Sequence, residues 1–147
     1  MGKMRLGQHF LFDKNILQKI IDAFGPDKNK NILEIGAGRG PLTELLAVNF
    51  KEVFAVEFDN YLYDYLVDRF QDFKNVFVIH KNILDTEIEK IPVNLAIGNV
   101  PYYITTPIIF KLIESKNISK FGLLIQKEVA KRIVSEKGCK DYGILTI

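Results

Sequence analysis

One glycine-rich segment of the chain has the composition of a ligand-binding turn. Residues 34–40 read EIGAGRG, and the glycines Gly36, Gly38 and Gly40 allow a tight turn and close approach of a ligand to the backbone. A dinucleotide pattern needs a further glycine where this chain has Pro41, and no Gly-Lys-Ser/Thr follows for a nucleoside triphosphate. The segment therefore favours a ligand of another class.

Two acidic residues accompany these glycines. Glu34 stands just before them, and Glu57 stands about twenty residues after Gly36. A carboxylate at that spot can accept hydrogen bonds from both hydroxyls of a ribose. Acids at Glu34 and Glu57 favour a cation, and an adenosyl sulfonium carries positive charge without a phosphate. The two signals together predict binding of such a ligand. The alternative is a turn that only connects a strand to a helix, with Glu57 solvated at a strand end.

A third pattern, Asn99-Val100-Pro101-Tyr102, directly follows an apolar run. Pro101 cannot continue a central strand, so the chain turns there and presents Asn99 and Tyr102 to the strand edge. The Asn99 amide oxygen and nearby backbone carbonyls can accept N–H bonds, and Tyr102 offers a flat face for stacking. This set suits a planar substrate with an exocyclic amine, such as adenine. The alternative is a strand-ending turn with a core tyrosine.

The elements that must position these residues alternate along the chain. Apolar runs and amphipathic spacing predict strands at 31–35, 53–58, 76–80, 95–97 and 122–125, and helices at 15–24, 41–50, 61–70, 107–114 and 127–135. This rhythm is typical of an α/β fold with a parallel sheet covered on both faces. Ligands of such sheets bind at the carboxyl ends of the strands, where all three patterns fall.

Composition and charge set broad limits. The 147 residues fit one domain, 48% of them are hydrophobic, and a net charge of +2 permits a nucleic-acid partner without indicating one. Apolar runs are too short to cross a bilayer, and no export signal is visible. A single cysteine, Cys139, suits a reducing cytosol, so we expect a cytoplasmic protein. One cysteine and two distant histidines do not make a metal site, and His80 is expected to be a surface or structural residue.

These motifs, taken together, resemble the ribosomal RNA adenine N6-dimethyltransferases, which modify two adjacent adenines near the 3′ end of small-subunit rRNA. The resemblance runs from about residue 5 to the last residue. The matching stretches are GQHFL at 7–11, EIGAGRG at 34–40, AVEFD at 55–59, NVPY at 99–102, TTP at 105–107, QKEVA at 126–130 and YGILT at 142–146.

The resemblance implies a Rossmann-like class I methyltransferase fold with a mostly parallel sheet, helices on both faces, and S-adenosylmethionine as cofactor. Family members continue through two more strands and a small helical domain. Residues 1–147 are therefore expected to be the S-adenosylmethionine-binding domain, shortened relative to the family. The expected partner is small-subunit rRNA or a pre-ribosomal particle, with no membrane and no metal.

The resemblance also assigns roles residue by residue. Gln8, His9 and Leu11 would close over the methionine end of the cofactor, Gly36 and Gly38 would lie against the methionine and ribose, and Glu57 would hold the ribose hydroxyls. Asn82 stands where the family usually has aspartate, and its amide oxygen would accept a hydrogen bond from the cofactor adenine's amine. Asn99 would contact both the cofactor and the target amine.

The chemistry expected at this site is an in-line displacement by adenine N6 on the methyl of the sulfonium. Asn99 and a backbone carbonyl near Val100 or Pro101 would accept hydrogen bonds from the amine, while Tyr102 stacks on the base. Most of the acceleration would come from orientation and a pre-set electrostatic site. For the basic residues Lys127, Lys131 and Arg132, the two readings are RNA phosphate binding and a solvated helix face.

Two rival functions remain open from the sequence. One is a large-subunit rRNA adenine methyltransferase of the antibiotic-resistance type, which shares the Asn-x-Pro-Tyr corner. Gln8-His9 and the stretch 142–146 favour the small-subunit family over it. The other is a non-catalytic RNA-binding or assembly module that keeps the fold. An inactive site is disfavoured by the glycine loop, Glu57 and Asn99. It is favoured by Asn82 and by the length of 147 residues.

Overall fold

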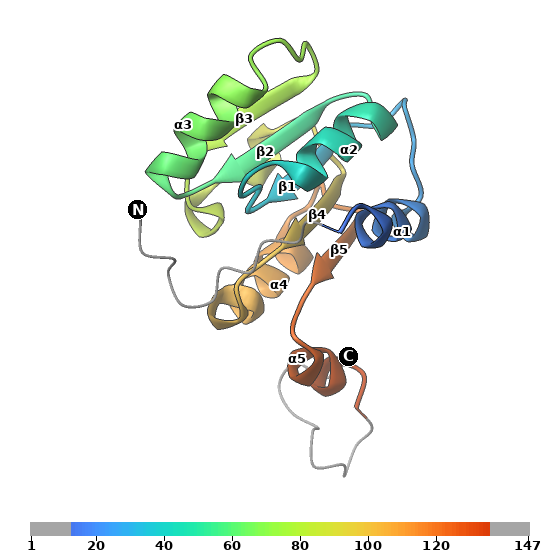
Figure 1. The fold of residues 1–147 in the computed structure, drawn as a ribbon. Helices are drawn as coiled ribbons and strands as arrows, with labels where there is room; N and C mark the ends of the chain where they lie inside the picture. Colours follow the sequence, from blue (N-terminus) through green and yellow to red (C-terminus); the bar gives the residue numbers. More distant parts are fainter. Residues whose placement is uncertain (1–12, 136–147) are drawn as a thin grey trace.

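The computed structural model of the chain describes residues 13–135, in which one five-stranded sheet forms the centre (Figure 1). Its strands are β1 (Ile32–Ile35), β2 (Val53–Glu57), β3 (Val76–His80), β4 (Leu95–Asn99) and β5 (Lys120–Leu124). All neighbours pair in parallel, in the order β3-β2-β1-β4-β5. The predicted parallel sheet is therefore confirmed. From β1 the chain adds β2 and β3 on one side, and it then returns to add β4 and β5 on the other side of β1. The gap between the carboxyl ends of β1 and β4 is therefore a topological switch point.

Helices cover both faces of the sheet. One face carries α1 (Lys14–Phe24), α2 (Pro41–Asn49) and α3 (Asn60–Arg69), whose apolar side chains form one core with residues such as Ile32 and Val53. The other carries the 3₁₀ helices η1 (Ile83–Asp85) and η2 (Ile88–Lys90) together with α4 (Thr105–Glu114). The last described helix, α5 (Lys127–Ile133), buries no residue and lies away from the sheet in Figure 1. All four residues of β1 are buried, as expected for a central strand with both faces covered.

Several element ends differ from the sequence expectations, because pairing and turn chemistry decide them. The fourth strand continues past residue 97 to Asn99, since Asn99 pairs with Leu124 of β5. The fifth strand begins two residues earlier than expected, at Lys120, for the same reason. The helix expected at 107–114 begins at Thr105, with Pro107 in its first turn, where a proline is tolerated. The two 3₁₀ helices after β3 were not predicted.

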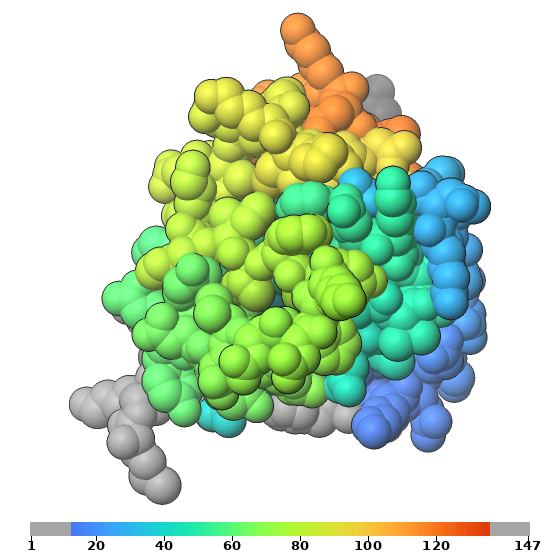
Figure 2. Space-filling model, turned by 90° about the horizontal axis from the view of Figure 1, so that it is seen from above, coloured from blue at the N-terminus to red at the C-terminus, as the bar shows by residue number. Residues whose placement is uncertain are grey.

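The loops that lead into the strands lie side by side at the amino edge of the sheet, as Figure 2 shows from above. Hydrogen bonds join these loops across long stretches of sequence. The Asn31 amide donates to the Pro92 carbonyl at 3.0 Å, and the Asn75 amide donates to the Lys51 carbonyl at 3.2 Å. Asparagine side chains that donate to backbone carbonyls therefore tie this edge together.

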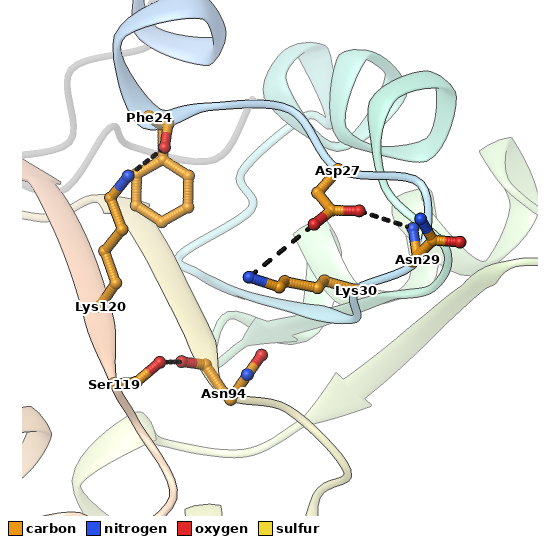
Figure 3. Close-up of polar contacts among 7 residues, drawn as sticks. All are labelled: Phe24, Asp27, Asn29, Lys30, Asn94, Ser119 and Lys120. Carbon is orange, nitrogen blue, oxygen red and sulfur yellow. Dashed lines mark hydrogen bonds and ion pairs between the residues drawn. The ribbon is translucent and has the colours of Figure 1, made fainter.

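The amino edge also fixes α1 to β5 (Figure 3). The Lys120 ammonium donates to the Phe24 carbonyl in the last turn of α1, and its nitrogen lies 4.7 Å from the centroid of the Phe24 ring. No basic residue of α1 itself occupies the last turn of that helix. Lys120 therefore supplies from β5 the positive charge that a helix C-terminus favours.

Replacing this lysine should loosen the contact between α1 and β5. We expect Lys120→Met to lower the free energy of unfolding by about 1–2 kcal/mol, because it removes a helix-terminal cation and a cation–π contact but keeps the apolar stem. Urea unfolding followed by circular dichroism measures the change. The matched control is Lys30→Met, whose exposed pairing with Asp27 at 3.8 Å should contribute little. Equal losses in the two variants would contradict the prediction.

Candidate functional site

A cavity of about 530 Å³ opens at the carboxyl edge of the sheet. Its walls come from the glycine-rich turn after β1, the end of β2, the segment after β3, and the corner after β4 that continues into η3 (Tyr102–Ile104). This volume lies in the range of small-molecule sites in proteins. The three sequence patterns therefore meet around one space, because the carboxyl ends of parallel strands share an edge.

Glu57 ends β2 and faces this cavity with its side chain fixed. The residue is 6% exposed. Its Oε2 accepts a hydrogen bond from the Gly38 N–H at 2.9 Å, and its Oε1 accepts from the Phe58 and Asp59 N–H groups, each at 2.9 Å. An ionised carboxylate offers about four acceptor positions, so the backbone occupies three and one remains for a ligand hydroxyl.

Glu34 lies deeper in the same wall and is 1% exposed. The Thr43 hydroxyl donates to its Oε2 at 2.6 Å. Burial raises the pKa of Glu34 from 4.5 to about 7, the Thr43 hydrogen bond opposes this rise, and the negative charge of Glu57 adds to it. The cavity thus holds two carboxyl groups, and a cation placed between them would favour the ionised form of Glu34.

Glu34→Gln should remove a pH dependence of stability. Folding raises the Glu34 pKa from 4.5 to about 7, so the folded state binds the proton more tightly than the unfolded state. The contribution of protonated Glu34 to stability is complete below its unfolded-state pKa of 4.5. It is lost as the pH rises through the folded-state pKa of about 7. From pH 4.5 to above 7, the wild-type free energy of unfolding should lose roughly 3 kcal/mol from this group.

Urea unfolding at pH 5 and pH 8 tests this expectation. Glutamine cannot ionise, so the Glu34→Gln chain should gain stability relative to wild type at pH 8 but not at pH 5. Glu114→Gln is the control, because that side chain is exposed at the end of α4. A wild-type pH dependence that persists unchanged in Glu34→Gln would count against a buried, proton-binding Glu34.

The glycine-rich turn is held from outside by α3. Arg69 donates to the Arg39 carbonyl at 2.5 Å and to the Glu44 carboxylate of α2 at 2.8 Å. Gly40 has φ +84°, and a Cβ there would lie 2.5 Å from Cε2 of Phe70, so only glycine fits. The turn is therefore shaped before any ligand arrives. Sequence reasoning missed Arg69, because nothing in its local sequence pattern shows that it reaches the turn.

The corner after β4 brings Asn99, Pro101 and Tyr102 to the cavity. Asn99 is half-buried at the strand end, and Tyr102 is 52% exposed. The Pro101 carbonyl already accepts from the Ile104 N–H at 3.2 Å and from the Thr105 hydroxyl at 3.1 Å. These two bonds occupy both lone pairs of that oxygen. Two carbonyls were expected to accept a hydrogen bond from a target amine. The Val100 carbonyl is therefore the better candidate, and Pro101 shapes the turn.

Asn82 lies just beyond β3 and lines the same cavity. Its Oδ1 accepts from the Leu84 N–H at 3.0 Å, which caps η1. The apolar neighbours Phe58 and Ile83, which the sequence analysis did not single out, form walls beside it. Phe58 directly follows Glu57, and Ile83 directly follows Asn82. Their positions next to polar site residues could have identified them from the sequence.

The remaining predicted residues divide into two groups. Gln8, His9 and Leu11 lie outside the described residues. Lys127, Lys131 and Arg132 lie exposed on α5, and none of them lines the cavity, although the preceding Gln126 does.

His80, expected to be a surface or structural residue, is exposed and stacks on Tyr63 with ring centroids 4.4 Å apart. Within residues 13–135, no group of three His, Cys, Asp or Glu side chains could hold a metal ion. No helix in that range is both long enough and apolar enough to cross a membrane.

The switch-point sheet, with the glycine turn after β1 and an acidic residue at the end of β2, defines a Rossmann-like α/β domain of the class I methyltransferase type. Residues 1–147 match the family model described as ribosomal RNA adenine dimethylase. The chain belongs to this family, as its motifs predicted.

Relatives with known names agree with this assignment. The chain is 46% identical over 155 residues to a ribosomal RNA small subunit methyltransferase A of Streptococcus gordonii, covering 99% of this chain and 53% of the relative. The crystal structure of a dimethyladenosine transferase from Plasmodium falciparum superposes with a TM-score of 0.85 at 33% identity, covering 95% of this chain and 51% of that one.

A 23S rRNA methyltransferase, ErmE, is also similar, with a TM-score of 0.78 and 27% identity over 84% of this chain and 50% of that one. The chain spans about half the length of the curated relatives it matches.

Proposed function

We propose that this domain binds S-adenosylmethionine in the cavity at the carboxyl edge and directs its methyl group to N6 of adenines in small-subunit rRNA. The observation that carries the proposal is that Glu57, which suits a ribose, and the Asn99–Tyr102 corner, which suits an adenine, face one cavity. Membership of the adenine dimethylase family supports it. Residues 1–147 are then the cofactor-binding domain of this activity.

The side chains present fit the cofactor. Glu57 is oriented by three backbone N–H groups toward a ribose hydroxyl, and Gly36 and Gly38 let the ligand approach the backbone closely. Glu34 and Glu57 together favour a cationic ligand over a phosphate. Gln8, His9 and Leu11 are proposed to close over the methionine end.

When bound, S-adenosylmethionine supplies a methyl group that an amine can take up while the sulfonium becomes a thioether. Asn99 and the Val100 carbonyl would accept the two N–H bonds of the target adenine and hold N6 in line with that methyl group. Tyr102 would stack on the ring. The N6 proton leaves to solvent after the new N–C bond forms. Acceleration comes from orientation and from acceptors fixed in place, without a covalent enzyme intermediate.

The proposed partner is small-subunit rRNA, alone or in a pre-ribosomal particle in the cytoplasm. The exposed Lys127, Lys131 and Arg132 on α5 are proposed to contact its phosphates. Such contacts release counterions, so RNA affinity should fall steeply as salt is added. A base in folded RNA must be swung out or presented unpaired to reach the cavity.

A second candidate is methylation of large-subunit rRNA. The likeness to the ErmE structure favours it, although the identity of 27% is below the 46% shared with the small-subunit relative. The two functions differ only in the RNA that is methylated. A non-catalytic assembly role is the third possibility, and it predicts cofactor binding without transfer.

The test has two stages. Calorimetric titration of the chain with S-adenosylmethionine should show micromolar binding. Transfer of tritiated methyl groups is then measured on unmodified small-subunit rRNA, on large-subunit rRNA and on small-subunit particles. Labelling of N6 in small-subunit adenines supports the proposal. Labelling only of large-subunit RNA supports the second candidate, and a chain that binds the cofactor but labels no RNA would overturn the proposed transfer.

A further inference from the structure

Two neighbouring tyrosines at the corner after β4 contact each other at the wall of the cavity. Tyr102 and Tyr103 both line this cavity, and they are 52% and 55% exposed. Their ring centroids lie 5.8 Å apart and their ring planes cross at 88°, which is an edge-to-face arrangement. Because the two rings are perpendicular, the contact with Tyr103 leaves at least one face of the Tyr102 ring uncovered.

The backbone beneath these two rings is fixed, so that only side-chain rotation is left to orient them. The Pro101 carbonyl accepts from the Ile104 N–H at 3.2 Å and from the Thr105 hydroxyl at 3.1 Å. The Tyr102 carbonyl accepts from the Thr105 N–H. Within residues 13–135 neither phenol hydroxyl makes a hydrogen bond, and Tyr103 is the aromatic ring that contacts Tyr102. Tyr103 is therefore the aromatic neighbour that restricts how the Tyr102 ring turns.

The orientation of a ring matters when that ring has to stack on a base. An exposed tyrosine exchanges among side-chain rotamers, and binding of a base then has to stop this exchange. A neighbouring ring that favours one orientation removes part of that cost before the base arrives. The stabilisation of an edge-to-face pair corresponds to a factor of about three to ten in an equilibrium constant. The contact thus couples Tyr103 to the face that Tyr102 offers.

We propose that Tyr103 is a positioning residue, which acts through its edge-to-face contact to hold the Tyr102 ring ready to stack on an unpaired base. This inference rests on the proposed function, in which Tyr102 stacks on the target adenine. In this role Tyr103 needs no contact of its own with the RNA or the cofactor. Its ring is required, whereas its hydroxyl is dispensable.

A fluorescent base measures the stacking directly. The probe is a short single-stranded oligouridylate that contains one 2-aminopurine, whose fluorescence falls when the base stacks on an aromatic ring. Titration with the chain, in the presence of S-adenosylhomocysteine, gives the dissociation constant. We expect the wild-type chain to quench the probe, Tyr103→Leu to raise the dissociation constant about threefold to tenfold, and Tyr103→Phe, which keeps the ring, to match the wild type.

Phe110→Leu is the matched control, because Phe110 is an exposed ring on α4 that does not line the cavity. It should bind the probe as the wild type does. Thermal melting of each variant shows that it is folded at the assay temperature. Since more than half of the Tyr103 side chain is exposed, the fold should tolerate leucine there.

A double variant separates positioning from direct contact. Tyr102→Leu removes the stacking face and should weaken probe binding about tenfold or more. Adding Tyr103→Leu to Tyr102→Leu should cause no further loss, because no ring is left to position. Losses that multiply in the double variant would show that Tyr103 contacts the RNA itself or supports the corner generally, and would overturn the inference.

The outcomes also separate this inference from the proposed function. Equal probe binding by the wild type and Tyr103→Leu overturns the inference and leaves the proposed function intact. The expected binding pattern in a chain that labels no RNA with tritium overturns the proposed methyl transfer and leaves the positioning role intact. A folded wild-type chain that does not quench the probe overturns the inference together with the stacking role of Tyr102.

Discussion

Glu57→Ala is expected to weaken binding of S-adenosylmethionine by about 100-fold or more. A ribose hydroxyl that donates to the one acceptor position left on this carboxylate makes a charge-assisted hydrogen bond of about 1.5–3 kcal/mol. The substitution also releases the Gly38 N–H, which Glu57 holds at 2.9 Å, so the glycine turn loses a support. Isothermal titration calorimetry measures the affinity, and thermal melting shows that the variant is folded at the assay temperature.

Glu52→Ala is the matched control for this result. Glu52 precedes the same strand at the amino edge, where its carboxylate accepts from the Asn31 amide at 2.8 Å, and it does not line the cavity. Its loss should lower stability without changing cofactor affinity. A folded Glu57→Ala chain with wild-type affinity would remove the ribose-binding role of this carboxylate and the main support for the nucleoside site.

Asn99→Ala should reduce methyl transfer by about 100-fold or more, with a smaller effect on cofactor affinity. The amide oxygen is the side-chain acceptor proposed for the target amine, and removing one preorganised acceptor or donor from a reacting centre costs on the order of 10²–10³ in kcat. Asn99 sits at the end of β4, where its backbone is fixed by pairing with Leu124. The alanine variant should therefore keep the strand.

Initial rates of tritium transfer to unmodified small-subunit rRNA, measured at saturating cofactor, give the kcat effect separately from binding. Asn94→Ala is the control at the opposite end of β4. The Asn94 backbone carbonyl accepts from the Ser119 N–H at 2.9 Å and from the Ser119 hydroxyl at 3.0 Å, and the Asn94 side chain is exposed. Because alanine keeps this carbonyl, the variant should behave as wild type. An Asn99→Ala chain that transfers methyl groups at the control rate would rule out a direct role for the amide.

Local patterns predicted most of the fold. Apolar runs located the five strands and amphipathic spacing located the helices, because burial of both sheet faces and of one helix stripe follows from residue order. The rule that parallel strands share their carboxyl edge then placed Glu57 and Asn99 on one side of the sheet. The connection after β3 was missed, because its second 3₁₀ helix, η2, is held by the distant Asn117 amide, which donates to the Ile88 carbonyl and to the following Val93 carbonyl, each at 3.0 Å.

The sequence by itself determined the family, the parallel sheet and the identity of the polar residues at its carboxyl edge. Only the tertiary structure decided how those residues are used. It showed Arg69 holding the glycine turn, the Pro101 carbonyl occupied within its own turn, and the Asn82 oxygen committed to a cap. It also buried Glu34 enough to raise its pKa to about 7. Lone pairs and desolvation depend on neighbours brought together by folding, so residue order alone does not reveal them.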